Sequence, residues 1–396
     1  MTLDQTINIS DLRRLAIRRL PRMAFDFIEG GCDDENGLAE NEAAFAAHRL
    51  VPRYLVDVSQ RDTSTQIAGQ SFALPLGFAP TGAAGMFRHD ADRMLARAAA
   101  ASNVPFVLSN ASHASIEEAV QAAPEQTWFQ LYGIQNPDMA ENMVRRAADA
   151  GVKTLVLSVD VPTQSNRERN RRNHFSQPLR VTPSMVFQAI THPSWTLDYF
   201  RNGGLPYMGN FRPYAPKGAS AAAVGDLFVS VFPAPALTWS FLEKVRRQWP
   251  RKLFIKGIMH PDDALRSAEM GVDGVMVSNH GARQLDRAPS PLQVLPAIHA
   301  AVGDRMEITL DGGVRRGSDI VIALCLGARM VFVGRPALYG VAAAGGPGAK
   351  KAIDIFAHEL GMVLAQIGCA RTADLGPHFL LPGPQANASA PMAILA

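Results

Sequence analysis

Short apolar runs alternate with helical segments over most of the chain. The apolar runs cover residues 74–79, 104–108, 127–129, 154–157, 252–255, 274–277, 306–310 and 330–333. The helical segments among them cover residues 92–102, 115–122, 138–150, 261–270, 291–301 and 318–326. Such a repeat of buried strands and helices predicts an α/β fold, a closed (β/α)8 TIM barrel. A doubly wound open sheet is the alternative.

Two regions depart from the alternation. Residues 1–70 precede the first run and predict an N-terminal helical cap. The helices expected there cover residues 11–19, 21–29 and 35–48. After the fourth run, about residues 176–236 hold several Gly and Pro residues and no regular alternation. We expect a long structureless insertion there, of the kind that is functional or mobile, within one domain of residues 1–396.

Nearly every predicted strand is followed by a polar or charged side chain. These residues are Thr81, Ser109, Gln130, Tyr132, Asp160, Lys256, His280, Asp311 and Arg335. The carboxyl ends of barrel strands form one rim, and active sites of this fold lie there. The sequence therefore predicts that these side chains converge on one mouth.

One stretch after the sixth run combines a base with a cation. His280 and Arg283 are three positions apart, and Gly281 between them lets the backbone bend. A base beside a fixed guanidinium suits a substrate that loses a proton and carries a carboxylate. The alternative is an ordinary turn with a solvated histidine and arginine.

Glycine and arginine follow the last two runs, at residues 311–317 and 334–335. Exposed backbone amides beside arginine form an anion site where barrels often bind phosphate. Two helix entries that need glycine for steric reasons are the alternative. Lys256 suits a cofactor that becomes anionic on reduction, such as a flavin, although a Schiff-base lysine or a structural ion pair would also fit.

Composition narrows the partners. Apolar residues make up 47% of the chain and charged residues 19%, which indicates a compact core. A net charge of +3 gives no reason to expect nucleic acid. Cys32, Cys325 and Cys369 are scattered without metal-ligand spacing, so we expect no metal and a reducing, cytoplasmic compartment. We find neither a signal peptide nor a membrane span.

The insertion mixes basic residues with apolar ones. Arg180, Arg201, Arg212 and Lys217 outnumber the acidic residues there, and aromatic and aliphatic side chains lie among them. This composition suits contact with a membrane surface. A lid or an oligomer contact is the alternative.

Four motifs together carry a family resemblance. They are Ser-Asn-His-Gly-Ala-Arg-Gln-Leu-Asp at 278–286, Lys256-Gly257, Asp-Gly-Gly-Val-Arg-Arg-Gly at 311–317, and Gly334-Arg335-Pro336. With them the chain resembles the FMN-dependent L-2-hydroxy acid oxidase/dehydrogenase family over nearly its whole length. The resemblance implies an FMN enzyme that oxidises an (S)-2-hydroxy acid to the 2-oxo acid and passes electrons to a quinone or other acceptor. It also implies a homotetramer and, because residues 192–198 are similar to the membrane-associating segment of the bacterial members, peripheral attachment to the inner face of the cell membrane.

The resemblance also implies a role for each matching residue. His280 would be the base, Asp160 would stabilise its imidazolium, and Tyr132 would bind the substrate oxygen. Arg167 and Arg283 would hold the substrate carboxylate, and Lys256 would face the flavin. The remaining FMN contacts would come from Pro80, Thr81, Gly82, Ser109, Gln130, Ser158, Ser278, Asp311, Gly313, Arg315, Gly334 and Arg335.

Departures from the family pattern bear on substrate and acceptor. Phe27 stands where the family usually has a tyrosine that helps to hold the carboxylate. Ala111 and Gly133 leave room for a bulkier, mandelate-like side chain, and Gly82 favours a dehydrogenase over an oxidase. The alternatives are an oxidase of the lactate or glycolate type that reduces O2 to peroxide, a barrel lyase or aldolase that uses Lys256, and a flavin- or phosphate-binding barrel without catalysis.

Overall fold

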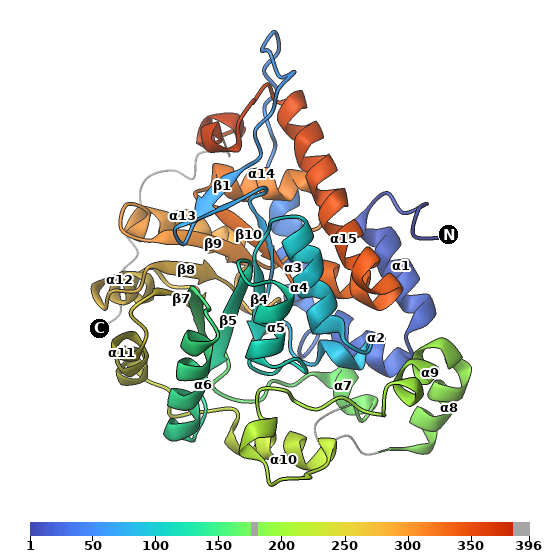
Figure 1. Cartoon of the computed structure of the whole chain (residues 1–396). Coiled ribbons are helices and arrows are strands. Elements are labelled where there is room, and N and C mark those ends of the chain that lie inside the picture. The colour runs from blue at the N-terminus through green and yellow to red at the C-terminus, as the bar shows by residue number, and fades with distance from the viewer. Residues whose placement is uncertain (176–180, 383–396) are drawn as a thin grey trace.

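Eight parallel strands close into a barrel in a computed structural model, which describes residues 1–175 and 181–382 (Figure 1). The strands follow one another around it in the order β10-β3-β4-β5-β6-β7-β8-β9. Their bounds are β3 Leu76–Phe78, β4 Phe106–Ser109, β5 Thr127–Tyr132, β6 Thr154–Ser158, β7 Lys252–Ile258, β8 Gly274–Val277, β9 Glu307–Asp311 and β10 Met330–Val333. The predicted TIM barrel is confirmed, and the open sheet is excluded because β10 pairs with β3.

Helices surround the barrel, and the first three, which precede the barrel strands in the chain, form the N-terminal cap. They are α1 Ile9–Arg19, α2 Arg22–Glu29, α3 Asn36–Ala46, α4 Ala91–Ala101, α5 Ile116–Ala122, α6 Pro137–Asp149, α11 Trp239–Gln248, α12 Pro261–Glu269, α13 Pro291–Val302, α14 Gly317–Cys325 and α15 Arg335–Gln366. The pattern did not predict α11 or α15. Helix α1 begins at Ile9, because the Asn8 side chain accepts the Asp11 N–H and caps the helix there.

The lower part of the barrel interior is filled by apolar side chains. Trp128 lies at its centre, with ring centroids 5.3 Å from Phe254 and 5.6 Å from Phe332. A hairpin that the sequence pattern did not predict, β1 Thr65–Ile67 and β2 Gln70–Phe72, adds Ile67 and Phe72 to this cluster. The hairpin therefore adds apolar packing at the N-terminal end of the barrel interior.

A polar layer lies above the apolar one. Side chains alternate between the two faces of a strand, so a residue two positions after an inward one also points into the barrel interior. Val107, Trp128, Val156, Phe254 and Met276 are inward and apolar. Two positions after each of them come Ser109, Gln130, Ser158, Lys256 and Ser278, all of them buried. Along these five strands the barrel interior thus changes from apolar to polar within two residues.

The insertion is helical, which corrects the expectation of a structureless loop. The insertion forms α8 Pro183–Thr191, α9 Pro193–Arg201 and α10 Ala221–Val231, and α7 Glu168–Arg172 lies just before it. Thr182 and Ser220 cap α8 and α10 with their side chains, and proline stands in the first turn of α8 and α9. Residues 176–180, including Arg180, lie outside the described ranges. Within those ranges no helix is long and apolar enough to cross a membrane.

Candidate active site

A buried cluster of charges lies at the mouth of the barrel. Lys256 Nζ donates to Ser278 Oγ at 2.8 Å and lies 3.3 Å from Asp311 Oδ2 and 3.6 Å from Asp160 Oδ2. Asp160 Oδ2 in turn lies 3.0 Å from His280 Nδ1. One lysine therefore sits between two carboxylates, and one of these carboxylates also contacts the histidine.

The charges in this cluster hold one another ionised. Burial alone would lower the pKa of Lys256, but Asp160 and Asp311 outweigh it and raise this pKa above its usual value. Burial opposes ionisation of Asp160, yet His280 and Lys256 lower its pKa to about 2. Asp160 is therefore a carboxylate at neutral pH, and it can stabilise a proton on the histidine.

His280 presents its other nitrogen to the mouth. Its Nε2 lies 3.4 Å from the hydroxyl of Tyr132, while Nδ1 faces Asp160. This geometry assigns the proton to Nδ1 and leaves Nε2 as the acceptor. Burial lowers the pKa of His280; Asp160 opposes this and Lys256 adds to it, with a net lowering. A neutral imidazole with a free Nε2 is the form that can take a proton from a substrate.

The loop that carries His280 has an uncommon backbone. His280, Gly281 and Ala282 have φ values of 58°, 63° and 57°, a left-handed run that is costly for the two residues with a side chain. Asn279 holds it in place, because its Oδ1 accepts the Ala282 N–H and its amide pairs with buried Asn41. The sequence pattern predicted a bend at Gly281 but missed Asn279 and Asn41, which pair across 238 residues.

Asp160 reaches the cluster because β7 has a glycine opposite it. A Cβ on Gly257 would lie 2.4 Å from the Cβ of Asp160, and Gly257 has a φ of 101°. Any side chain there would push the carboxylate away from Lys256 and His280. The Lys256-Gly257 motif thus supplies the cation and the space for its partner.

Two arginines face the mouth without a carboxylate partner. Among the ion pairs of the described residues, none involves Arg167 or Arg283. Arg283 Nη1 donates to the carbonyls of Phe27 and Gly30, and Arg167 Nη2 donates to Gln284 Oε1. Burial lowers the pKa of both guanidinium groups, and each lies close enough to the other for Arg167 to lower the pKa of Arg283 further. An anion placed between them would relieve this repulsion.

Phe27 contributes an aromatic wall beside these arginines. Its ring packs against Phe87 and Phe175 at 5.8 and 5.7 Å, and the Arg283 guanidinium carbon lies 5.2 Å from its centroid. The ring thus holds Arg283 by a cation–π contact but offers no hydroxyl to a ligand.

The small residues of the mouth differ in the space they leave. A Cβ on Gly82 would lie 3.2 Å from the Cβ of Ala111, so these two residues form one small-residue patch. The space beside Gly133 is occupied, because a Cβ there would lie 2.7 Å from Leu237 of the insertion. The expectation that Gly133 leaves room for a substrate is therefore wrong. At Gly82 and Ala111 the side chains facing each other are small.

Glycine turns follow β9 and β10: the turn after β9 lies against Asn41, and Gly334 after β10 lies against Thr81. Gly313 has a φ of 84°, and a Cβ on Gly334 would meet only Thr81, at 3.6 Å. The arginine side chains there are already engaged. Arg335 donates to carbonyls at the end of α2, including that of Gly30, and Arg315 pairs with Glu42. The N–H groups of Arg315 and Arg316 donate to Asp319 and that of Gly317 to Glu359, so a phosphate here would bind to other amides of the two turns, with the guanidinium charges nearby.

Buried polar atoms in the mouth lack a partner, as a bound cofactor would require. Within the described residues, Gln130 Nε2 and Ser158 Oγ are buried without a hydrogen bond, although Ser109 Oγ donates to Gln130 Oε1. Leaving such groups unpaired is costly. A planar ring with polar edges above this layer would give Gln130 and Ser158 hydrogen-bond partners, and its phosphate would lie at the glycine turns. The residues present therefore fit FMN. Pro80 lies at the same end of the barrel, two residues after β3 ends at Phe78.

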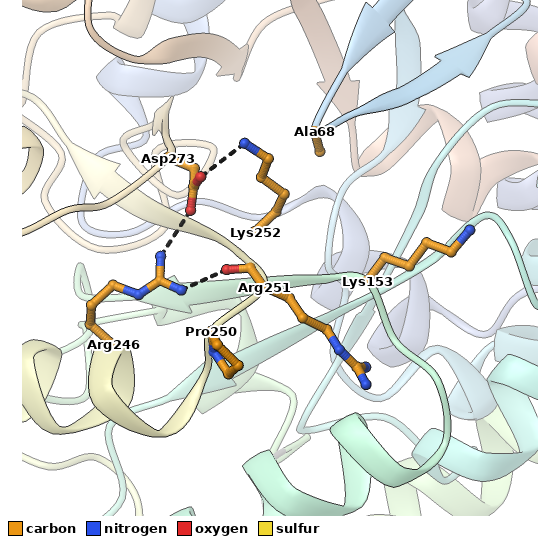
Figure 2. A pocket seen from close by; sticks show the side chains of 7 residues that line it. All are labelled: Ala68, Lys153, Arg246, Pro250, Arg251, Lys252 and Asp273. Carbon is orange, nitrogen blue, oxygen red and sulfur yellow. Dashed lines mark hydrogen bonds and ion pairs between the residues drawn. The ribbon is translucent and has the colours of Figure 1, made fainter.

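A cavity of about 480 Å³ lies at the opposite, N-terminal end of the barrel (Figure 2). Its lysines and arginines have partners within the protein: Lys252 and Arg246 share Asp273, and Arg251 donates to the carbonyls of Ala148 and Val152. Figure 2 shows Arg246 and Lys252 directed at Asp273, while Arg251 and Lys153 extend away from it. We therefore place the functional site at the mouth.

Comparisons with known proteins agree with this geometry. The family described as FMN-dependent dehydrogenase matches residues 16–382. The chain is 40% identical to an (S)-mandelate dehydrogenase of Pseudomonas putida over 94% of its own length and 93% of that protein. It is 39% identical to an L-lactate dehydrogenase of Caulobacter vibrioides over 94% of its own length and 96% of that protein. A solved structure of the "monotopic membrane protein (S)-mandelate dehydrogenase" superposes with a TM-score of 0.91 at 40% identity, covering 95% of this chain and 99% of that one.

Proposed function

The chain belongs to the FMN-dependent dehydrogenase family, and we propose that its substrate is an (S)-2-hydroxy acid with a bulky, mandelate-like side chain. It is an FMN-dependent enzyme that oxidises a 2-hydroxy acid. The proposal for this chain's own residues rests on one observation: a neutral His280 faces the mouth beside two arginines without a carboxylate partner.

The two arginines would fix the substrate by its carboxylate. Arg167 and Arg283 lie close together at the mouth, and a planar guanidinium binds a carboxylate through two parallel hydrogen bonds. Phe27 adds packing but no hydrogen bond. We therefore expect a weaker hold on the carboxylate than a tyrosine at this position would give.

Proton transfer would fall to His280. Its Nε2 takes a proton from the substrate, and Asp160 stabilises the imidazolium that forms. Tyr132 stays protonated at neutral pH, since burial and Asp160 raise its pKa to about 12, so its hydroxyl can donate to the substrate oxygen. Oxidation to the 2-oxo acid removes two electrons and two protons: His280 would take one proton, and FMN, when bound, would supply the acceptor for both electrons and the other proton. Lys256 would keep a positive charge beside the ring.

The small patch of Gly82 and Ala111 supports a bulky substrate. The atoms nearest to a Cβ on Gly82 belong to Ala111, whereas Leu237 closes the side at Gly133. A phenyl group fits such a patch better than the methyl group of lactate, which would leave it empty. The similarity to a mandelate dehydrogenase supports the same choice.

The insertion supports a membrane contact and a lipid-soluble acceptor. Helices α8 and α9 pack against each other at the edge of the molecule (Figure 1). Their inner sides are fixed: Trp195 Nε1 donates to the Met86 carbonyl and the Tyr199 hydroxyl to the Gly85 carbonyl. Their outer side exposes Val186, Phe187, Ile190, Leu197 and Phe200, which we call the α8–α9 surface.

We propose that the α8–α9 surface enters the headgroup region at the inner face of a membrane and that a quinone takes the electrons. Phe187 and Phe200 are 68% and 78% exposed, an unfavourable arrangement in water alone. An oxidase that uses O2 remains the second candidate.

We also propose that the chain forms a homotetramer, with the exposed Tyr54 and Leu55 at a contact between copies.

A substrate panel with two acceptors tests this proposal. Purified enzyme is assayed with (S)-mandelate, (S)-lactate and glycolate, first with a short-chain quinone and then with O2 alone. We expect the highest kcat/KM for (S)-mandelate, with quinone reduction and little peroxide. Peroxide formed in proportion to substrate would support the oxidase instead, and a preference for glycolate would overturn the bulky substrate.

A further inference from the structure

The end of the insertion lies on the strand that carries Tyr132. The Gln135 N–H donates to the Val231 carbonyl at 2.9 Å, and Gln135 Nε2 donates to the Pro233 carbonyl at 2.8 Å. Leu237 packs on Gly133. Residues 231–237, which we call the strap, thus contact residues 133–135, the three residues directly after Tyr132.

Phe232 of the strap packs against the ring of Tyr132. The two ring centroids are 4.7 Å apart with the planes tilted by 42°. On its other side Phe232 stacks on Phe228 of α10 at 5.1 Å, and Phe228 packs on buried Phe211 at 5.0 Å. A row of three aromatic rings therefore connects the interior of the insertion to the active-site tyrosine.

Tyr132 has few other groups to fix it. Its hydroxyl lies 3.4 Å from His280 Nε2, a long contact, and its ring centroid lies 6.2 Å from that of His280. A tyrosine held at one end by a long contact depends on ring packing for its orientation. Phe232 provides the closest ring contact that it has among the described residues.

We infer that Phe232 is a positioning residue: the strap holds the Tyr132 ring so that its hydroxyl points at the substrate oxygen. This inference rests on the proposed function, in which Tyr132 donates to that oxygen. It gives the insertion a second role, since the segment that carries the membrane contact also completes the active site. It also explains the glycine at 133, because only glycine admits Leu237 there.

Three variants test the inference. Phe232→Ala removes the ring contact, and Phe232→Trp keeps one. We expect Phe232→Ala to retain FMN and to lower the rate of flavin reduction about tenfold, chiefly in kcat, while Phe232→Trp stays within about threefold of wild type. Val229→Ala, an exposed position on the same helix, is the matched control and should not change the rate.

A double-mutant cycle with Tyr132→Phe shows whether Phe232 acts through the tyrosine hydroxyl. Once that hydroxyl is gone, Phe232→Ala should have little further effect on the rate. Multiplying effects of the two substitutions would overturn the inference.

Hydrogen exchange gives a readout that does not depend on turnover. In the protein without substrate, Phe232→Ala should speed exchange of the Gln135 amide, which bonds to the strap, while Val229→Ala should not. Unchanged exchange at Gln135 would contradict the strap even if no hydroxy acid reduced the wild-type flavin. The latter result would instead overturn the proposed function.

Discussion

The barrel mouth and the insertion satisfy their side chains in opposite ways. At the mouth, Lys256 has two carboxylates as partners, and within the described residues the groups left over are polar: Gln130 Nε2 and Ser158 Oγ have no hydrogen bond, and the two arginines have no carboxylate. In the insertion, the polar groups of α9 are bonded to the barrel, and what lacks a partner is the apolar α8–α9 surface. The unsatisfied groups therefore indicate what each region binds: a charged substrate and a polar cofactor at the mouth, and an apolar phase at the insertion.

This difference predicts that substitutions at the mouth change chemistry and that substitutions on the α8–α9 surface change location. The largest effect should come from His280→Ala. Without the base, flavin reduction by the hydroxy acid should fall about 10³- to 10⁴-fold, with FMN still bound. Stopped-flow absorbance under anaerobic conditions measures the rate, and the visible spectrum checks the FMN content. A variant that kept a tenth of the wild-type rate would exclude His280 as the base.

Lys256→Met should have the next largest effect, on stability. It would leave Asp160 and Asp311 buried without their shared cation, at a cost of about 3–5 kcal/mol in the free energy of unfolding. Denaturant unfolding of the apoprotein measures this cost. The double variant Lys256→Met/Asp311→Asn is the control and should recover part of the loss, because one of the stranded charges is gone. Equal stability of both variants would contradict the pairing.

Phe27→Tyr tests the carboxylate site by adding a donor. A hydrogen bond to a charged group contributes about 1.5–3 kcal/mol, so KM for the hydroxy acid should fall at least tenfold if the hydroxyl reaches the carboxylate. Phe87→Tyr, a change of the same kind at a fully buried neighbour, should not tighten binding. An unchanged KM for Phe27→Tyr would show that the carboxylate lies elsewhere.

The rate should depend on pH through His280. Burial lowers the pKa of this residue in the folded protein, so the neutral base persists below the usual histidine pKa of about 6.5. We expect kcat/KM to be constant at neutral pH and to fall tenfold for each pH unit below the His280 pKa. Asp160→Asn removes a group that raises this pKa and should move the fall to lower pH. A shift to higher pH would contradict the contact between Asp160 and His280.

The smallest effect on turnover should come from the α8–α9 surface. The triple variant Phe187→Ser/Ile190→Ser/Phe200→Ser removes most of its apolar area, so the protein should no longer sediment with vesicles of phosphatidylethanolamine and phosphatidylglycerol. Its kcat/KM in detergent should stay within about twofold of wild type. Ile7→Ser, at an isoleucine of similar exposure elsewhere on the surface, should leave vesicle binding intact. Persistent binding of the triple variant would favour a lid or an oligomer contact.

The mouth could be predicted from sequence because it follows strand periodicity. Once a strand such as β5 is recognised, Gln130 must point inward two positions after Trp128, and the same rule places Lys256 after Phe254. Local pattern says nothing about contacts between distant segments. Asn41 meets Asn279 across 238 residues, and Leu237 fills the space at Gly133.

The helices of the insertion were missed although a signal was present. Thr182 followed by Pro183, and Ser220 before an alanine run, are N-terminal helix signals. The many Gly and Pro residues between these short helices concealed them. Which side of each helix faces the barrel depends on partners such as Met86 and Gly85, and no local pattern reveals these.

Anaerobic bleaching of the bound flavin tests the central claim most directly. The enzyme is mixed with (S)-mandelate or (R)-mandelate in the absence of oxygen, and absorbance near 450 nm is followed. The proposed (S)-2-hydroxy acid substrate, supported by the similarity to an (S)-mandelate dehydrogenase, predicts rapid, complete bleaching by the (S) form and none by the (R) form. A flavin that neither (S)-mandelate nor any other 2-hydroxy acid bleaches would contradict the assignment of this mouth as a hydroxy acid dehydrogenase site.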